Sequence, residues 1–189
     1  MGSIKKKILE SAIVLAAESD WNTITLDLIS KRADVSVSRV YEYFPTKATF
    51  LCEIMTQTNR AILKDYVFFD SEEPEMDKLL EILMARFDVL KPRKSAIASM
   101  LRSVGTDPVT LLLTFPEFIK SISLMLQVAG FNISGFTGLI RVKVTGFIYL
   151  STMRVWLKDN SQDLTKTMAH LDKSIRIAKV FIQSSGSEQ

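Results

Sequence analysis

The chain has 189 residues, of which 47% are hydrophobic and 24% are charged, and its formal net charge is +3. This length supports one sizeable core or two small ones, and the single cysteine, Cys52, excludes a disulfide within the chain. We expect a cytoplasmic protein without a membrane span, because residues 4–19 show helical periodicity rather than a signal sequence and glycines interrupt the uncharged stretch 121–140.

The chain is predicted to be all-helical. Glycine and proline are few and stand where helices should end, and no alternating strand pattern persists. A first helix is expected over 3–18, with Ser3 as its cap and Ile4, Ile8, Ala12 and Leu15 as its buried stripe.

Residues 25–47 have the pattern of a helix-turn-helix. Thr25 is positioned to cap a helix over 26–33, and Ser36 to cap a second helix over 37–43. Pro45 then breaks the chain, and Thr46 is expected to cap a long helix that continues to about Phe69.

The remainder is predicted as further helices after an acidic loop at Asp70–Glu75. Pro108 is expected to open a short helix and Pro116 the first turn of the next, which should end before Gly130. The other expected helices cover 75–90, 93–104, 135–158 and 162–183. The helix over 135–158 is apolar nearly all round, so it must be covered on several sides.

The second helix of the turn motif has the residue types that DNA recognition needs. Small, polar or basic side chains in a first turn can reach base edges, and hydroxyls and cations beside it can hold phosphates. Arg39 is the best candidate for a bidentate contact with guanine. The full set of predicted DNA-binding residues is Thr25, Ser36, Val37, Ser38, Arg39, Tyr41, Tyr43 and Lys47.

A structural interpretation of the same residues stays open. Thr25 and Ser36 would then be only helix caps, and Tyr41 and Phe44 only core. Residues 1–50 hold seven Lys/Arg against six Asp/Glu, which is a weak positive charge for a nucleic-acid binder. Glu42 on the reading helix also repels phosphate unless it faces a cytosine amino group.

Residues 4–50 resemble the N-terminal domain of the TetR family of bacterial transcription regulators. The resemblance rests on ordered matches: Ile8, Ala12, Leu15 and Ala16, then Thr23-Ile24-Thr25-Leu26, Ile29 and Ala33, and above all Val35-Ser36, Val40-Tyr41-Glu42-Tyr43-Phe44, Lys47 and Phe50. Asp34 stands where the family usually has glycine, and Ala48 replaces the usual acidic residue.

The resemblance implies an all-α, TetR-like homodimer with two domains. A three-helix helix-turn-helix domain (1–50) would bind double-stranded DNA, each subunit reading half of a palindromic operator. A helical effector-binding and dimerisation domain (51–189) would bind a small apolar ligand that releases the DNA, as in a repressor.

The last two predicted helices carry apolar surface beyond what one partner would cover. Dimerisation is the preferred explanation, with Ile140, Trp156, Leu164, Met168, Leu171, Ile175, Ala178 and Ile182 as the expected interface. The alternative is that this seam closes the core of its own subunit. A ligand pocket is expected to be lined by Phe87, Ile97, Met100, Leu101, Leu112, Phe115, Phe118, Ile122, Met125, Phe147 and Met153, which could equally be ordinary core.

A second local similarity points to a different function. Residues 156–163, with Thr167, Leu171, Asp172 and Ile175, resemble a segment of the COQ9 family of ubiquinone-biosynthesis proteins, which share the TetR-like fold and are reported to bind lipid. The alternative function is therefore a lipid- or quinone-binding accessory protein that does not bind DNA.

Catalysis has little support in the sequence. His170 is the only histidine and is expected to face solvent, while Cys52 has no histidine near it in sequence. No metal-ligand cluster, phosphate-binding glycine loop or nucleophile elbow is present. We therefore expect no enzyme activity, no cofactor and no metal.

Overall fold

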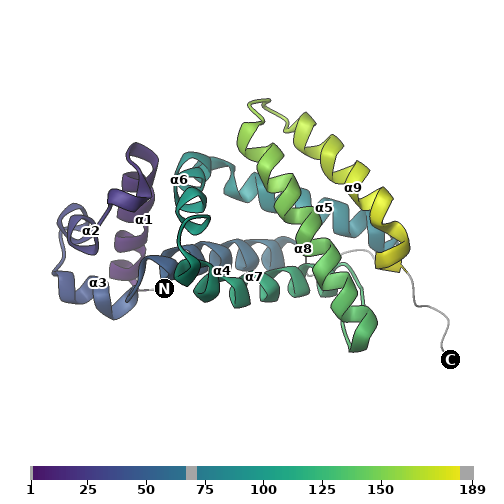
Figure 1. Cartoon of the computed structure of the whole chain (residues 1–189), viewed down its shortest axis with the longest axis horizontal. Coiled ribbons are helices and arrows are strands. Elements are labelled where there is room, and N and C mark those ends of the chain that lie inside the picture. Colours follow the sequence, from purple (N-terminus) through teal and green to yellow (C-terminus); the bar gives the residue numbers. More distant parts are fainter. Residues whose placement is uncertain (1, 67–71, 184–189) are drawn as a thin grey trace. The chain divides into compact units, whose positions relative to one another are not determined.

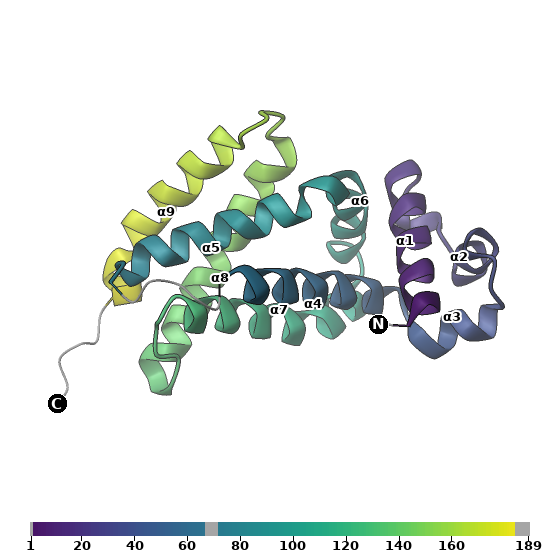
Figure 2. The ribbon, with the colours of Figure 1, turned by 180° about the vertical axis from the view of Figure 1, so that it is seen from behind.

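A computed structural model of the chain describes residues 2–66 and 72–183, and within these ranges every regular element is helical. Figures 1 and 2 show the helices from opposite sides. In chain order they are α1 (Ser3–Glu18), η1 (Trp21–Thr23), α2 (Leu26–Ala33), α3 (Val37–Tyr43), α4 (Lys47–Tyr66), α5 (Glu75–Leu90), η2 (Lys91–Arg93), α6 (Lys94–Val104), α7 (Pro108–Val128), α8 (Gly135–Lys158) and α9 (Thr165–Gln183). The predicted all-α fold is confirmed.

The described chain forms two compact units, and the first comprises Met1–Gln57 and Leu90–Phe118. Here α1 packs against α2 and α6 (Figure 2). Three aromatic side chains form the centre of this core: Phe50 stacks on Phe44 with ring centroids 4.1 Å apart and meets the edge of Trp21 at 5.7 Å. Such aromatic contacts add to the free energy of burial, so α4 is firmly joined to the short helices before it.

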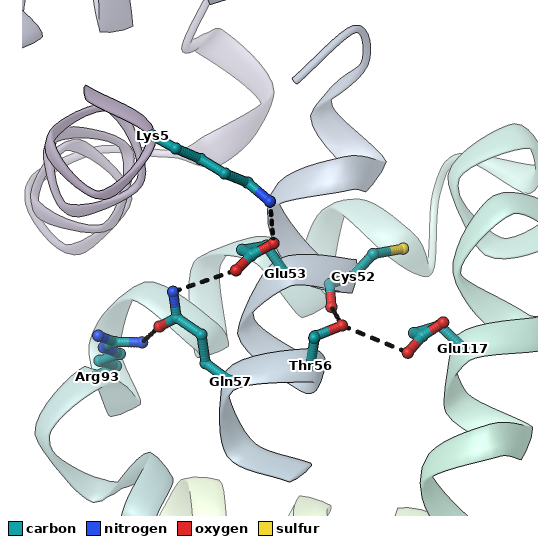
Figure 3. A network of polar contacts seen from close by, with 7 residues as sticks. All are labelled: Lys5, Cys52, Glu53, Thr56, Gln57, Arg93 and Glu117. Carbon is teal, nitrogen blue, oxygen red and sulfur yellow. Dashed lines mark hydrogen bonds and ion pairs between the residues drawn. The ribbon is translucent and has the colours of Figure 1, made fainter. Parts of the chain in front are cut away.

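A network of polar side chains ties the first half of α4 to its neighbours within this unit (Figure 3). Lys5 of α1 forms an ion pair with Glu53 at 2.5 Å, and Gln57 donates to the same carboxylate at 3.4 Å. Arg93 donates to Gln57 at 3.0 Å and to Glu10 of α1 at 2.7 Å. Because α1 and α4 share these partners, a displacement of α4 would disturb α1.

Two expectations about the first unit are wrong at α1. Gly2, not Ser3, is the N-cap residue, and Ile4 is exposed rather than part of the buried stripe. The residues buried along α1 are Ile8, Leu9, Ala12, Ile13, Leu15 and Ala16. Ile4 lies in the first turn of α1 and is 40% exposed.

The second unit comprises Thr58–Val89 and Ile119–Gln189. In it α8 and α9 lie side by side (Figure 1). Phe87 of α5 stacks on Tyr149 of α8 with ring centroids 5.0 Å apart and lies 5.7 Å from Trp156. These large buried rings give the unit a core of its own.

Residues 108–128 form one helix, so the prediction that Pro116 opens a new helix is wrong. Pro116 lies inside α7, where it removes the backbone bond to the carbonyl four residues earlier. That carbonyl belongs to Leu112, whose residue is 73% exposed, so water can take the place of the missing donor. The expected end before Gly130 is confirmed, since Gly130 has a φ of +100°, which suits glycine.

The last helix begins at Thr165 rather than at Gln162. Leu164 has a φ of +54°, and this left-handed residue separates the preceding turn from the helix. Asp159 Oδ2 accepts hydrogen bonds from the backbone and hydroxyl of Thr167, at 2.8 and 2.7 Å, and Oδ1 accepts from Ser161. Asp159 therefore caps α9 from eight residues away.

We expect Asp159→Asn to lower the free energy of unfolding by about 2 kcal/mol at pH 7, because an amide nitrogen would face buried donors. Burial alone would raise the pKa of Asp159, but hydrogen bonds from Ser161 and Thr167 hold it well below its usual range. The stabilisation is therefore complete above the usual aspartate pKa of about 4 and is lost as the pH falls below it. Urea unfolding at pH 7 and at about pH 3 measures both effects.

The control for this prediction is Asp163→Asn, which makes the same change at an exposed position close by. We expect it to leave the unfolding free energy unchanged within about 0.5 kcal/mol. Equal losses in the two variants, or an Asp159→Asn effect that persists undiminished in acid, would contradict the capping role.

One described helix, α7, is long and apolar enough to cross a membrane by length and composition, and a third of its most apolar window (33%) is buried in the fold. One such helix is weak grounds for a span, because core helices pass the same test. The predicted end of the fourth helix at Phe69 and the start of the acidic loop at Asp70 lie outside the described residues.

Candidate nucleic-acid interface

The turn between α2 and α3 is built from three local features. Thr25 Oγ1 accepts the Leu28 amide at 3.1 Å, which caps α2 as predicted. Asp34 ends α2 with a φ of +48°, in the left-handed conformation that the resemblance assigned to glycine. Ser36 lies at the N-cap of α3 as predicted, but its hydroxyl pairs with the Ser38 hydroxyl at 2.9 Å instead of with the helix backbone.

The outward face of α3 is open. Val40 is the one residue of α3 that is fully buried, and the exposed residues around it are Ser36, Val37, Ser38, Arg39, Tyr41 and Glu42. Tyr41 is 55% exposed, so it is not a core residue. Phe44, by contrast, is buried in the aromatic core. The first turn of α3 can therefore reach a partner molecule without any rearrangement of the backbone.

Arg39 is paired on its own helix. Its Nη1 donates to Glu42 Oε2 at 2.9 Å, and both side chains are about half exposed. An exposed pair of this kind contributes at most about 1 kcal/mol, so the guanidinium can leave Glu42 for another acceptor at small cost.

Lys47 lies at the start of α4, but its ammonium group turns toward the backbone of η1. Lys47 Nζ donates to the Trp21 carbonyl and, at 3.4 Å, to the Asn22 carbonyl, and it lies 5.0 Å from the centre of the Trp21 ring. Burial lowers its pKa, while the charges of Asp20 and Asp107 oppose this. A phosphate contact of Lys47 stays a prediction, and these carbonyls compete for its ammonium group.

The structure thus brings most of the predicted DNA-binding residues to one exposed region. Thr25, Ser36, Ser38, Arg39 and Tyr41 are all exposed, and Tyr43 is half-buried. The cations of α2 are engaged by carboxylates: Lys31 pairs with Asp27 at 2.7 Å, and Arg32 pairs with Glu18 at 2.9 Å. Nearby carboxylates therefore neutralise these two cations, in line with the low net charge of residues 1–50.

The expected dimer seam is mostly internal. Trp156, Leu164, Leu171, Ile175, Ala178 and Ile182 are buried within the chain itself, and only Ile140 and Met168 keep exposed surface. The seam therefore closes the core of its own subunit, the alternative that the sequence left open. These six residues therefore offer another copy little surface, although Ala178 lines the exposed groove described next.

A different apolar face on α8 and α9 is exposed, and of its exposed residues only Phe147 was among the predicted site residues. Phe147 (75%), Ile177 (70%) and Phe181 (57%) line it together, and Leu150 and Val180 are exposed on the same two helices. A groove of about 490 Å³ runs along this face. Its signal in the sequence was a second apolar row on α9, at 177, 180 and 181, beside the more regular seam.

The predicted pocket residues are divided between the two units. Phe87, Ile122, Met125 and Met153 lie buried in the second unit, and Ile97 and Met100 lie buried in the first. Leu112, Phe115 and Phe147 are exposed, and Phe147 lines the groove on α8 and α9. Leu101 and Phe118 are half-buried in the first unit. Among the described residues no group of three or more His, Cys, Asp or Glu side chains is placed to hold a metal ion.

Comparison with known proteins supports the resemblance of the N-terminal part. Residues 8–54 match the family described as bacterial regulatory proteins, tetR family. The HTH-type transcriptional repressors KstR of Rhodococcus jostii and Mycolicibacterium smegmatis are 30% identical over 53 residues and 32% identical over 47 residues. These matches cover 28% and 25% of this chain, and 25% and 23% of the relatives, so the chain spans about a quarter of their length.

Solved structures extend the likeness to the fold of almost the whole chain. A TetR transcriptional regulator from Nitrosomonas europaea has a TM-score of 0.76 at 18% identity, covering 94% of this chain and 99% of that one. A TetR transcriptional regulator from Rhodococcus sp. RHA1 has a TM-score of 0.72 at 19% identity, covering 96% and 98%. The helix-turn-helix of this chain is therefore similar to that of the tetR family over residues 8–54, and the chain shares the all-helical fold of these solved regulators.

Proposed function

We propose that the chain is a cytoplasmic, dimeric, DNA-binding transcriptional repressor that binds a palindromic operator and releases it when a small ligand with an apolar body binds. The observation that carries this proposal is the open first turn of α3, where Val37, Ser38 and Arg39 are exposed beyond a capped turn. The similar KstR proteins are transcriptional repressors, which supports repression rather than activation.

In this proposal α3 enters the major groove and Arg39 reads a guanine through its N7 and O6 atoms. The hydroxyls of Thr25, Tyr41 and Tyr43 hold the phosphates on either side. Lys47 joins them if its ammonium group exchanges the Trp21 carbonyl for a phosphate oxygen. Phosphate contacts fix the register, and Arg39 supplies most of the sequence preference.

Dimerisation in this proposal uses the exposed face of α8 and α9 rather than the internal seam. Phe147, Leu150, Ile177, Val180 and Phe181 form an apolar patch that monomeric proteins rarely expose. A second copy is the occupant that fits, because a two-fold axis would bring the same patch on both chains together. Binding to a palindrome requires the two copies of α3 to lie one turn of DNA apart, about 34 Å.

Ligand release in this proposal acts through α4. This helix begins beside η1 at Lys47, carries Glu53 in the network that includes Lys5 and Arg93, and continues into the second unit with Asn59. A ligand that shifts the second half of α4 would strain the contacts of its first half. Such a coupling requires that the ligand bind more tightly to the protein with α4 shifted than to the protein with α4 in its DNA-binding position.

We expect Arg39→Ala to weaken binding to a selected operator by about 1–3 kcal/mol and to relax the preference at one base-pair position. Fluorescence anisotropy with the operator and with duplexes mutated at single positions measures both effects. The fold should be unaffected, because the Arg39–Glu42 pair is exposed.

The matched control is Arg102→Ala, which removes an exposed arginine from α6. It should keep the affinity and the base preference of the parent protein. If Arg39→Ala keeps both as well, α3 is not the reading helix and the proposed recognition is wrong.

The lipid-binding alternative gains no support from the residues that suggested it. Trp156 is fully buried beside Phe87, and Asp159 caps α9. Thr167 is the partner of that cap, and Leu171 and Ile175 belong to the internal core. The similarity to the COQ9 segment is therefore explained by packing and capping in the last two helices.

A further inference from the structure

The core of the second unit contains a buried arginine for which the described residues supply no counter-charge. Arg86 of α5 is 2% exposed, and a guanidinium keeps its charge at any ordinary pH. Among the described residues no carboxylate forms an ion pair with it, and its Nε has no hydrogen-bond partner. Buried charges in proteins are normally paired with an opposite charge, so this one needs an explanation.

The partners that Arg86 does have are neutral. Its Nη1 donates to Asn59 Oδ1 at 2.5 Å and lies 3.7 Å from Met125 Sδ, and its guanidinium lies 5.4 Å from the centre of the Tyr149 ring. Asn59 in turn donates to the Ser121 hydroxyl at 2.9 Å. A thioether sulfur is a weak acceptor on a flexible side chain, so Met125 is the contact that a stronger acceptor would displace.

Arg141, the other buried arginine of this unit, shows the usual solution. It donates to the Ile182 carbonyl at 2.8 Å and to the Asn132 carbonyl at 2.6 Å. Ile182 lies in the last turn of α9, where the helix dipole favours a cation. Among the described residues no backbone carbonyl accepts from Arg86 in this way, and its Nε has no acceptor.

A second buried polar group, on the helix that carries Tyr149, also lacks a hydrogen-bond partner among the described residues. The hydroxyl of Thr145 is fully buried and has no hydrogen-bond partner among the described residues. Thr145 precedes Tyr149 by four residues on α8, so it lies one turn away on the face that the Arg86–Tyr149 contact defines. The same region thus has two donors without acceptors.

From this juxtaposition we infer that the ligand of the second unit is a monocarboxylic acid with an apolar body, whose carboxylate binds Arg86. A carboxylate accepts a bidentate pair from one guanidinium edge, which would use Nε. One buried cation balances one negative charge, which favours a carboxylate over a doubly charged phosphate. Met125 and Tyr149, which contact Arg86, and Phe87, which stacks on Tyr149, are all buried and suit the apolar rest of such a molecule.

This inference rests on the proposed function only for the statement that the chain binds a small ligand. It corrects the expected ligand from a purely apolar molecule to an acid. Binding can be measured on the free protein, so a negative result here leaves DNA recognition untouched, and a failure to bind DNA leaves this site untouched.

The test uses the full chain with decanoate and 1-decanol, two probes of equal chain length that differ in the head group. Isothermal titration calorimetry gives the affinities, and thermal unfolding gives the melting temperature of each variant without a probe. We expect the parent protein to bind decanoate at least about tenfold more tightly than decanol, because only the carboxylate can compensate Arg86.

The first variant is Arg86→Met, which removes the charge and keeps an apolar side chain of similar length. It should lose the preference for decanoate and should melt no lower than the parent protein, because it removes an uncompensated buried charge. The control is Arg154→Met, the same change at an exposed position of α8 in the same unit, which should keep the preference.

The second variant, Asn59→Asp, places a carboxylate where Arg86 already donates. It should raise the melting temperature and abolish the preference for decanoate, because the internal carboxylate takes the place of the ligand's. Absence of decanoate binding, equal affinity for decanoate and decanol, or a preference that survives in either variant overturns the inference. A lower melting temperature of Asn59→Asp overturns it as well, since Arg86 would then not lack a counter-charge.

Discussion

Ile177→Asp/Phe181→Asp should turn the protein into a monomer and weaken its binding to a palindromic duplex by about a hundredfold or more. The two side chains are neighbours on one face of α9, four residues apart, and are 70% and 57% exposed. Two aspartates at the centre of a two-fold interface would meet two more from the other copy, unpaired and cut off from water. Losing the dimer removes the second half-site contact, and linked binding of this kind contributes factors of about 10² to 10⁴.

Light scattering coupled to size-exclusion chromatography measures the mass, and anisotropy with half-site and full-site duplexes measures the affinity. The monomer should fold normally, because both replaced residues are exposed in the single chain. Its affinity for a half-site should equal that of the parent protein, which separates loss of assembly from loss of recognition.

The matched control is Val109→Asp/Leu113→Asp, which makes the same pair of changes at the same spacing on exposed positions of α7. This variant should remain a dimer and keep its affinity for the palindrome. A dimer that persists in Ile177→Asp/Phe181→Asp, or a monomer in the control, would show that the copies meet through another surface.

Phe50→Ala should destabilise the protein by about 3–5 kcal/mol, the range found when a fully buried aromatic ring is removed. Phe50 is fully buried, stacks on Phe44 and meets the edge of Trp21. These contacts connect α4 to the end of α3 and to η1, so the cavity would open beneath the helix-turn-helix. Chemical denaturation followed by circular dichroism gives the free energy, and DNA binding should be lost with the fold of this unit.

Tyr41→Ala provides the comparison, because it removes a ring of similar size from an exposed position of α3. Its free energy of unfolding should stay within about 0.5 kcal/mol of the parent protein. A Phe50→Ala variant that loses less than about 1 kcal/mol would contradict the assignment of these aromatic rings to the core of the motif.

Much of the fold could be predicted because its determinants are local. Helix caps, helix-breaking residues and apolar spacing predicted the bounds of α1, α2, α3, α5 and α8, and those of α6 to within one residue. Asp34, which stands where the resemblance expects glycine, adopts the left-handed conformation, and aspartate is one of the few residues that tolerate it. The prediction for Pro116 was wrong because the sequence does not distinguish a proline inside a helix from one that starts a helix. In the structure the helix continues through Pro116, and the exposed position of Leu112 lets water bond to the carbonyl that loses its donor.

The features that depend on partners far away in the sequence could not be predicted. The apolar row with the most regular spacing on α9 closes the subunit core, whereas the less regular row at 177, 180 and 181 is exposed, and only the position of α8 decides between them. Arg86 has the same appearance in the sequence as a surface arginine. Its burial beside Asn59, Met125 and Tyr149 follows from three other helices of the second unit.

The central claim is that two copies of α3 read a palindrome through the first turn that carries Arg39. A selection of bound duplexes from a random pool, at low and at physiological salt, tests it most directly. The account predicts a two-fold symmetric consensus whose half-sites lie about one helical turn apart, with affinity that falls steeply as salt rises. Recovery of no enriched sequence, or of a site without symmetry, would contradict it.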